Sequence, residues 1–287
     1  MPKPKILIQL DPDSHASVFD AVVAIDAEVD RLLQYDRVEP EQVRDLVHGA
    51  IFTRGPQELA STAIFIGGGN VTAGEELLKQ VRGAFFGPMR VSVLLDANGC
   101  NTTAAAAVLA AAKHAPLRGA TAVVLGGTGP VGQRAARLLA GQGASVRVAS
   151  RALERATAVC QAITQRIPDA KLSPFQCSSA AEAMAALDGA QIVIASGAAG
   201  VELVSAEIRG NSESLRVAID LNAVPPLGIG GVEVTDKAKD RDGAFCYGAI
   251  GVGGTKMKIH RAAIQQLFTA NNLVLDAEEV FAIGQKL

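Results

Sequence analysis

The sequence has few of the features that mark nucleic-acid, membrane or metal-binding proteins. It contains no tryptophan and only 2 tyrosines among 287 residues, so aromatic platforms for stacking on single strands are scarce. The formal net charge is -2, with no basic surplus that would attract a phosphate backbone. No apolar run approaches the length of a membrane span. What remains is an ordinary globular composition, 49% hydrophobic and 20% charged.

Cysteine is equally sparse. The four cysteines form no C-x-x-C pair, so we expect no metal site and no redox motif, only free thiols. The N-terminal apolar run, residues 6–10, is too short for the core of a signal peptide and has no cleavage site after it. These features predict a cytoplasmic protein.

Strand-like and helix-like segments alternate along the chain. Short apolar runs typical of strands covered on both faces lie at 6–10, 61–66, 90–95, 120–125, 145–149, 192–195 and 216–220. Helical segments are predicted at 75–84, 131–140 and 180–187. This alternation predicts an α/β protein: a Rossmann-type doubly wound parallel sheet and a second, N-terminal α/β domain.

The domain boundary is predicted near residue 103. There an alanine-rich helix, 104–114, follows the capping residues 101–103 and links the two domains. Helices at 258–270 and 276–285 are expected to return to the first domain. We therefore assign 1–103 with about 265–287 to an N-terminal α/β domain and 104–264 to the Rossmann-type domain, with a cleft between them.

A glycine-rich motif directly follows the strand at 120–125. It reads G-x-G-x-x-G and comprises Gly127, Thr128, Gly129, Pro130, Val131 and Gly132. A simple glycine turn is the alternative in a chain with 29 glycines. A strand before the motif and a helix after it favour a dinucleotide site, in which the helix N-terminus faces the pyrophosphate.

The end of the next strand distinguishes the two nicotinamide cofactors. An NAD site places a carboxylate there for the ribose hydroxyl, whereas this chain has Ser150, Arg151 and Arg155. Guanidinium groups bind a 2′-phosphate with charge-assisted hydrogen bonds, so we predict NADP as the cofactor. The alternative is a solvated start of a helix.

Two later strand ends should reach the same crevice, because ligands of such sheets bind at the carboxyl ends of the strands. Their small residues would allow close approach of the cofactor, although simple turn chemistry explains them equally well. The candidates are Ser196, Gly197, Ala198, Asn222 and Ala223.

Several longer motifs carry a resemblance to a known family. They include Ser17-Val-Phe-Asp20, Ser61-Thr-Ala-Ile-Phe-Ile-Gly-Gly-Gly69, Asn98-Gly-Cys-Asn-Thr-Thr103 and Ala249-Ile-Gly-Val-Gly-Gly-Thr-Lys256. With them the chain resembles, nearly end to end, the NADP-dependent methylenetetrahydromethanopterin/methylenetetrahydrofolate dehydrogenases of methylotrophic bacteria. The resemblance implies a pterin held in the cleft, a homo-oligomer (trimer or hexamer), and hydride transfer from the methylene carbon to NADP⁺ in one-carbon metabolism.

The resemblance also suggests the substrate-side residues. Lys256, Asp20 and Asp96 are the catalytic candidates, Lys256 to orient a carbonyl or the cofactor and the carboxylates to bond the pterin or offset the methenyl cation. Substrate contacts are expected from Phe19, Asn98, Asn101, Thr102 and His260. Each has a plainer alternative, since Asp20, Asp96, Asn101 and Thr102 could cap helices, Phe19 could be core, and Lys256 and His260 could lie on a solvated face.

One missing motif limits the chemistry. Folate dehydrogenase/cyclohydrolases use a Y-x-x-x-K motif, but Tyr35 is followed by Glu39 at the lysine position and Tyr247 by Gly251. We therefore predict dehydrogenase activity without cyclohydrolase activity. Two rivals are a shikimate- or quinate-type dehydrogenase, for which the first 78 residues offer no lysine beyond Lys3 and Lys5, and a non-catalytic NADP- or pterin-binding protein.

Overall fold

The computed structural model describes residues 3–287, which form two compact units. One unit comprises the described chain up to Thr102 together with Met257–Leu287, and the other is Thr103–Lys256. Helix α4 (Cys100–Ala112) carries the chain into the second unit, and α9 (Ala249–Leu267) carries it back. Since α9 is one continuous helix of 19 residues, the return falls inside it at Met257, earlier than the expected position near 265.

The first unit is built on a parallel sheet of five strands in the order β12-β4-β3-β1-β2. The strands are β1 (Ile6–Leu10), β2 (Arg31–Tyr35), β3 (Thr62–Ile66), β4 (Ser92–Leu95) and β12 (Val274–Leu275). Every residue of β3 and β4 is buried, which explains why both stand out as apolar runs. β2 is mostly exposed at the sheet edge, so its sequence carries no such signal and the strand was not predicted.

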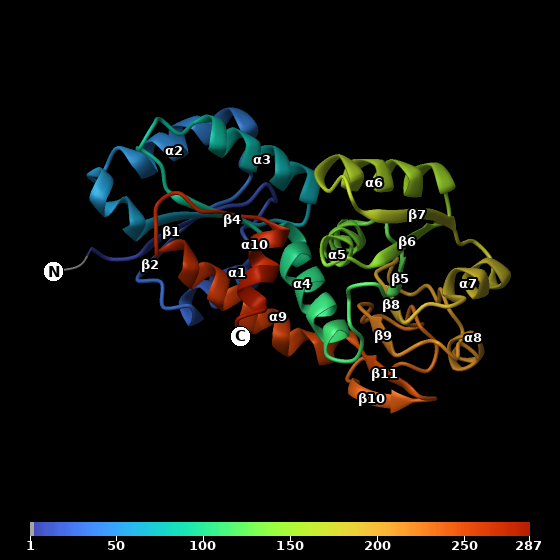
Figure 1. The fold of residues 1–287 in the computed structure, drawn as a ribbon. Coiled ribbons are helices and arrows are strands. Elements are labelled where there is room, and N and C mark those ends of the chain that lie inside the picture. The colour runs from blue at the N-terminus through green and yellow to red at the C-terminus, as the bar shows by residue number, and fades with distance from the viewer. Residues whose placement is uncertain (1–2) are drawn as a thin grey trace. The chain divides into compact units, whose positions relative to one another are not determined.

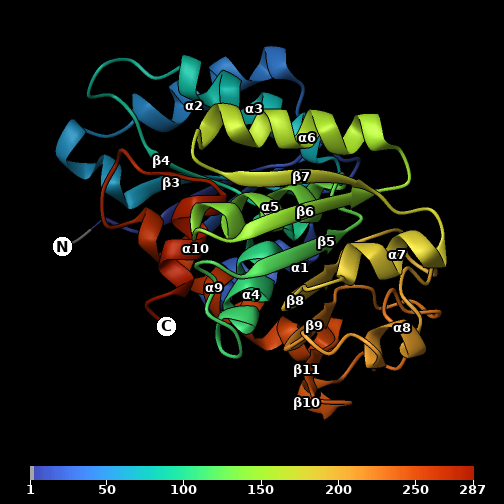
Figure 2. The same cartoon turned by 45° about the vertical axis from the view of Figure 1, so that its right-hand side comes forward.

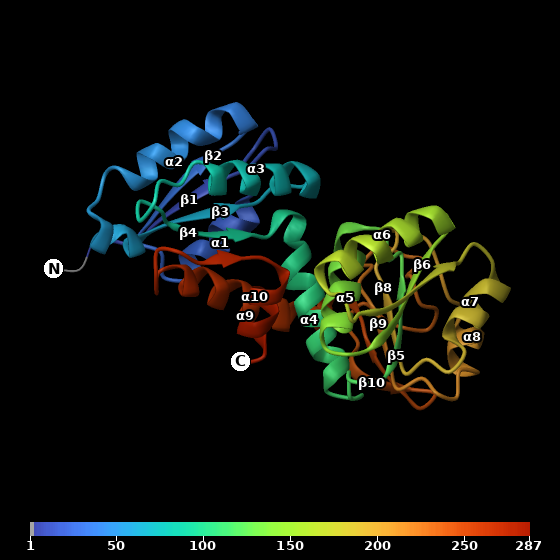
Figure 3. The same cartoon turned by 45° about the horizontal axis from the view of Figure 1, so that its top comes forward.

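Helices cover both faces of this sheet. Figure 3 shows α2 and α3 on one face and α1 and α10 on the other. Their bounds are α1 (Val18–Asp26), α2 (Val43–Ile51), α3 (Val71–Gly83) and α10 (Ala277–Gly284), and short 3₁₀ helices occur at Pro40–Gln42, Pro56–Ser61 and Ala97–Gly99. Helix α3 begins before the predicted residue 75 because the Asn70 side chain accepts a hydrogen bond from the Ala73 amide, 3.1 Å away.

The second unit contains a sheet of seven strands in the order β10-β11-β9-β8-β5-β6-β7. The strands are β5 (Thr121–Leu125), β6 (Ser145–Ser150), β7 (Lys171–Gln176), β8 (Ile192–Ala195), β9 (Val217–Asp220), β10 (Lys237–Arg241) and β11 (Ala244–Tyr247). All pairs are parallel except β10 with β11. From β7 to β11 the order is that of a Rossmann sheet, so the predicted fold class is confirmed.

Four helices flank this second sheet. They are α5 (Pro130–Gly141), α6 (Leu153–Arg166), α7 (Ala180–Leu187) and α8 (Ala206–Gly210). Figures 1 and 2 show α6 running beside β6 and β7, and Figure 3 shows α5 and α6 on one face with α7 and α8 on the other. The winding direction reverses between β5 and β8, and the carboxyl ends of those two strands therefore form the switch point where such sheets bind ligands.

Both connecting helices begin earlier than their sequences suggested. Residues 101–103 were expected to cap α4, but they lie in its first turn, and Asp96 supplies the cap by accepting the amides of Asn101 and Thr102. Helix α9 begins at Ala249 within a glycine-rich segment, where a side chain at Gly251 would collide with the backbone of Asp236. Close packing, and not helix propensity, requires glycine there.

Across residues 3–287, no helix is both long enough and apolar enough to cross a membrane.

Candidate functional site

The glycine-rich loop lies at the switch point of the second unit. Two backbone hydrogen bonds of 3.0 Å hold the loop in place. The Gly127 amide donates to the Ala149 carbonyl, and the Gly129 amide donates to the Gly126 carbonyl. Gly129 is the N-cap of α5 and Pro130 occupies the first helical turn. The first amides of a helix have no partner inside it and sit at the positive end of its dipole, so this loop presents a site for an anion.

Glycine is required at different positions of the loop for different structural reasons. A Cβ on Gly132 would lie 2.6 Å from the Gly126 carbonyl oxygen, and one on Gly127 would lie 2.8 Å from Val148 Cγ1. A Cβ on Gly129 would meet nothing closer than 3.5 Å. Packing inside the protein therefore requires Gly127 and Gly132, whereas Gly129 leaves room for a group that approaches from outside.

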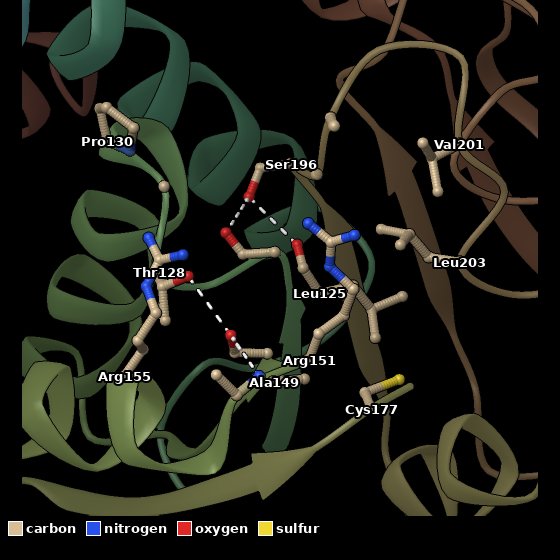
Figure 4. A pocket seen from close by; sticks show the side chains of 16 residues that line it. Leu125, Thr128, Pro130, Ala149, Arg151, Arg155, Cys177, Ser196, Val201 and Leu203 are labelled. Carbon is tan, nitrogen blue, oxygen red and sulfur yellow. Dashed lines mark hydrogen bonds between the residues drawn. The ribbon is translucent and has the colours of Figure 1, made fainter. Parts of the chain in front are cut away.

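A pocket of about 480 Å³ opens beside this loop at the carboxyl ends of β5, β6 and β8 (Figure 4). Nine of the predicted cofactor residues line it: Thr128, Gly129, Pro130, Ser150, Arg151, Arg155, Ser196, Gly197 and Ala198. Five others are not among the lining residues: Gly127, Val131, Gly132, Asn222 and Ala223. The structure thus brings together three segments that are far apart in the sequence.

The basic end of the pocket is formed where β6 leads into α6. The hydroxyls of Thr128 and Ser150 are 3.4 Å apart, and Ser150 Oγ also accepts the Ala152 amide at 3.3 Å. The side chains of Arg151 and Arg155 line the same pocket, and Figure 4 shows Arg155 beside Thr128. Within residues 3–287, neither guanidinium makes a hydrogen bond or ion pair, and no residue lining the pocket is acidic. The pocket therefore presents two uncommitted positive charges.

Seven other residues line the pocket and were not predicted to do so: Leu125, Gly126, Ala149, Ala152, Cys177, Val201 and Leu203. Cys177, Val201 and Leu203 form an apolar wall opposite the glycine loop (Figure 4). Burial raises the pKa of the Cys177 thiol, and the nearby Glu182 charge raises it further, so the group is an uncharged thiol at neutral pH. Cys177 follows the unpredicted edge strand β7, and the other two lie in a loop without a motif, so the sequence carried no signal for them.

In the first unit, polar residues gather at the carboxyl ends of β1 and β3. The buried Asp11 follows β1, and its carboxylate accepts the amides of Asp13 at 2.9 Å and Ser17 at 3.0 Å. Ser17 in turn caps α1 by accepting the Asp20 amide at 3.2 Å. These bonds shape the loop so that Phe19 and Asp20 occupy the first turn of α1.

The predicted residues Phe19, Asp20 and His260 lie in one neighbourhood. A Cβ on Gly67, just after β3, would be 3.1 Å from Asp20 Oδ2, so this carboxylate lies against the Gly67 backbone. The ring of His260, from α9, lies 6.4 Å from the Phe19 ring and 5.6 Å from the Phe65 ring. His260 is fully buried and Phe19 is 52% exposed, so His260 is not on the solvated face that was its plainer alternative.

The residues after β4 divide into two groups. Asp96, Asn101 and Thr102 are buried and bonded to one another, with Thr102 Oγ1 donating to Asp96 Oδ2 at 2.6 Å. Asn101 Nδ2 donates to the Leu95 carbonyl at 2.6 Å and to Asp276 Oδ1 at 3.0 Å. Asn98 is exposed, and its amide donates to the Gly68 carbonyl at 2.5 Å. Asn98 thus joins the group at β1 and β3, while the other three hold the start of α4.

Lys256 is a half-buried residue of α9, at the last position of the second unit. Its helix continues directly into His260 in the first unit. One α-helical turn therefore separates two of the predicted site residues along the chain.

Comparison with known proteins places this arrangement in a family. The N-terminal profile of methylene-tetrahydromethanopterin dehydrogenase matches residues 18–98. A shikimate 5-dehydrogenase from Listeria monocytogenes, solved with shikimate and NAD, superposes with a TM-score of 0.57 at 16% identity over 99% of this chain and 96% of that one. A likeness at that identity shows the shared two-domain fold alone, so it does not support the shikimate-type rival.

Two relatives from Methylorubrum extorquens match across the whole chain. The bifunctional protein MdtA is 44% identical over 285 residues, 99% of both chains. An NAD(P)-dependent methylenetetrahydromethanopterin dehydrogenase is 31% identical over 292 residues, 98% of both chains. The resemblance predicted from the motifs is confirmed, and the chain belongs to the methylene-tetrahydromethanopterin dehydrogenase family of oxidoreductases.

Proposed function

We propose that the protein oxidises methylenetetrahydromethanopterin, methylenetetrahydrofolate or both to the methenyl form, with NADP⁺ as hydride acceptor. Family membership supports the reaction type. The observation that carries the choice of cofactor is the pocket beside Gly129, with Arg151 and Arg155 at its basic end.

The residues present fit a dinucleotide. Gly129 leaves the space that a pyrophosphate needs to approach the backbone, and the first turn of α5 supplies amides to it. The Ser150 hydroxyl and the two guanidinium groups suit a 2′-phosphate, since no carboxylate in the lining would repel it. The bound nicotinamide would supply the acceptor carbon for the hydride.

We assign the pterin to the carboxyl edge of the first sheet. Its strand order, β2-β1-β3-β4-β12, reverses direction between β1 and β3, which is where flavodoxin-like sheets bind their ligands. Phe19, Asp20 and Asn98 gather at this edge, and the ring of the fully buried His260 lies 6.4 Å from the Phe19 ring. Asp96, Asn101 and Thr102 then act as positioning residues, because their side-chain bonds fix the start of α4.

The chemistry requires little from acid or base groups. The C–H bond of the methylene bridge breaks and its electron pair leaves with the hydrogen, so the pterin becomes an amidinium cation delocalised over its own two nitrogens. The protein then acts mainly by holding the reacting carbons in position and excluding water. We propose that the Asp20 carboxylate offsets the developing cation and that Lys256 orients the bound partners.

We also propose that cyclohydrolase activity is absent. The Y-x-x-x-K motif is missing, and the Tyr247 hydroxyl lies 2.7 Å from His114 Nε2. Burial raises the pKa of Tyr247, so its hydroxyl stays protonated at neutral pH and does not serve as a base.

A spectrophotometric assay of NADPH formation tests the proposal. Each methylene-pterin is supplied with NADP⁺ or NAD⁺. We expect NADP⁺ to be reduced to NADPH, with a KM for NADP⁺ lower than that for NAD⁺. Replacing Arg151 with alanine should raise the KM for NADP⁺ far more than that for NAD⁺, and equal effects would refute the 2′-phosphate site. Enzyme-dependent loss of the methenyl product at constant NADP⁺ would refute the absence of cyclohydrolase activity.

A further inference from the structure

Asp220, at the end of β9, is a buried carboxylate that no part of the proposed chemistry uses. It is 0% exposed, and it does not line the dinucleotide pocket. Its Oδ1 accepts the Asn222 amide at 3.0 Å, and its Oδ2 accepts the Ile229 amide at 2.7 Å. One carboxylate thereby holds together both ends of the loop 221–229. Burial raises the pKa of Asp220, and the backbone amides of Asn222, Ile229 and Gly228 partly oppose that rise.

The loop that Asp220 closes is bonded to the loop that follows β8. The Gly228 carbonyl accepts the amides of Leu203 at 2.8 Å and Val204 at 3.1 Å, and the Val224 carbonyl accepts the Gly200 amide at 3.2 Å. The side-chain amide of Asn222 donates to the Ala198 carbonyl at 3.4 Å. Residues 196–204 are thus bonded at several points to a loop whose two ends share the Asp220 carboxylate as hydrogen-bond acceptor.

The anchored loop forms a wall of the dinucleotide pocket. Five of its residues line that pocket: Ser196, Gly197, Ala198, Val201 and Leu203. We infer that Asp220 is a positioning residue for the dinucleotide, which acts through residues 221–229 to set the wall formed by 196–204. The inference rests on the proposed cofactor site and assigns it a support that lies outside the pocket.

The packing around Asp220 leaves no simple substitute for a carboxylate. A Cβ on Gly228 would lie 2.9 Å from Asn222 Nδ2 and 3.1 Å from Asp220 Oδ1, so the loop closes tightly over this group. An apolar side chain at position 220 would leave buried amides unpaired, which is costly. An asparagine keeps the size of the side chain but replaces one accepting oxygen by a donor, so one of the two ends of the loop loses its anchor.

Asp236 provides a matched control in the same unit. It is also buried, and it accepts the Glu233 amide at 2.8 Å and Arg241 Nε at 2.7 Å. Among the described residues, its own hydrogen bonds stay within 233–248 and do not reach residues 196–204. Replacing Asp236 with asparagine therefore removes a buried carboxylate of similar kind without loosening the pocket wall.

The test compares Asp220→Asn with Asp236→Asn in the full-length protein. We expect Asp220→Asn to raise the Kd for NADPH, measured by calorimetry without pterin, by roughly tenfold, about 1.4 kcal/mol. Hydrogen exchange of amides in 197–204 should accelerate in the same variant. Asp236→Asn should lower the melting temperature and leave both measurements unchanged. Equal rises of Kd in the two variants, or an unchanged Kd in Asp220→Asn, would overturn the inference.

A second variant covers the case in which Asp220→Asn does not fold. Asn222→Ala removes the side-chain bond to the Ala198 carbonyl and keeps the backbone bond to Asp220, and it should raise the Kd for NADPH and accelerate exchange near residue 198. An unchanged Kd in that variant would overturn the inference. If the wild type binds NADPH but oxidises no methylene-pterin, the proposed reaction fails while the Kd comparison still decides the role of Asp220. If the wild type binds no dinucleotide, both fail.

Discussion

Replacing Gly129 with alanine separates the binding role of the glycine loop from its packing role. Gly129 has φ -77° and ψ 165°, a conformation that alanine adopts freely. The new Cβ would lie 3.5 Å from the Gly126 carbonyl oxygen and 3.7 Å from the Ser196 carbonyl oxygen, which are ordinary contacts. Alanine restricts the unfolded chain, which stabilises the fold, but it is a poorer N-cap than glycine, so we expect the free energy of unfolding to change by no more than about 1 kcal/mol.

The affinity of Gly129→Ala for NADPH should fall much more than its stability changes. Gly129 lines the pocket, where the pyrophosphate has to approach the backbone, so an added methyl group should obstruct that approach. Loss of one charge-assisted hydrogen bond is worth about 1.5–3 kcal/mol, so the Kd for NADPH should rise roughly 10- to 150-fold. Calorimetry suits the measurement, since the chain contains no tryptophan to report binding by fluorescence.

Gly132→Ala is the control for packing. Its Cβ would lie 2.6 Å from the Gly126 carbonyl oxygen and 2.7 Å from Ser196 Oγ, and the backbone oxygen has little freedom to move. Overpacking of this kind costs about 1–3 kcal/mol, so urea unfolding should shift to lower concentration in this variant. Wild-type affinity in Gly129→Ala, or a loss of stability as large as that of Gly132→Ala, would refute the assignment of the loop.

Three further outcomes are expected. Lys256→Ala should lower kcat/KM for the methylene-pterin at least tenfold, about 1.4 kcal/mol, with little change in melting temperature, and an unchanged kcat/KM would remove Lys256 from the site. Asp96→Asn should lower the free energy of unfolding by about 1–3 kcal/mol, because the carboxylate accepts two amides of α4 and the Thr102 hydroxyl; a urea midpoint equal to that of the wild type would contradict this. Burial alone would raise the pKa of Asp236, but hydrogen bonds from Arg241 and the Glu233 amide hold it below its ordinary value of 3.8. The ionised Asp236 carboxylate therefore stabilises the protein above pH 3.8, and this contribution is lost as the pH falls through the lowered pKa. The difference in free energy of unfolding between the wild type and Asp236→Asn should shrink in acid. A difference independent of pH would count against the ion pair.

Local sequence determined the buried elements of the fold. The strands β3, β4, β8 and β9 are buried at every position, and burial on both faces produces the apolar runs that predicted them. The edge strands β2 and β7 are largely exposed, and Pro174 lies within β7, so composition gave no indication of either. Their places follow from pairing with β1 and β6, which is a property of the assembled sheet.

The sequence also determined the glycine loop, because its chemistry is local. A strand, three glycines at fixed spacing and a helix N-terminus lie within a short stretch of chain, and Ser150 with Arg151 follows at the next strand end. Only the tertiary structure showed that Gly129 alone among those three leaves space, and that Asp96 caps α4. The approach of Phe19, Asp20 and His260 to one another, and the bracing of 196–204 by Asp220, likewise depend on strands and helices far apart in sequence. Contacts of that kind are set by packing and not by spacing along the chain.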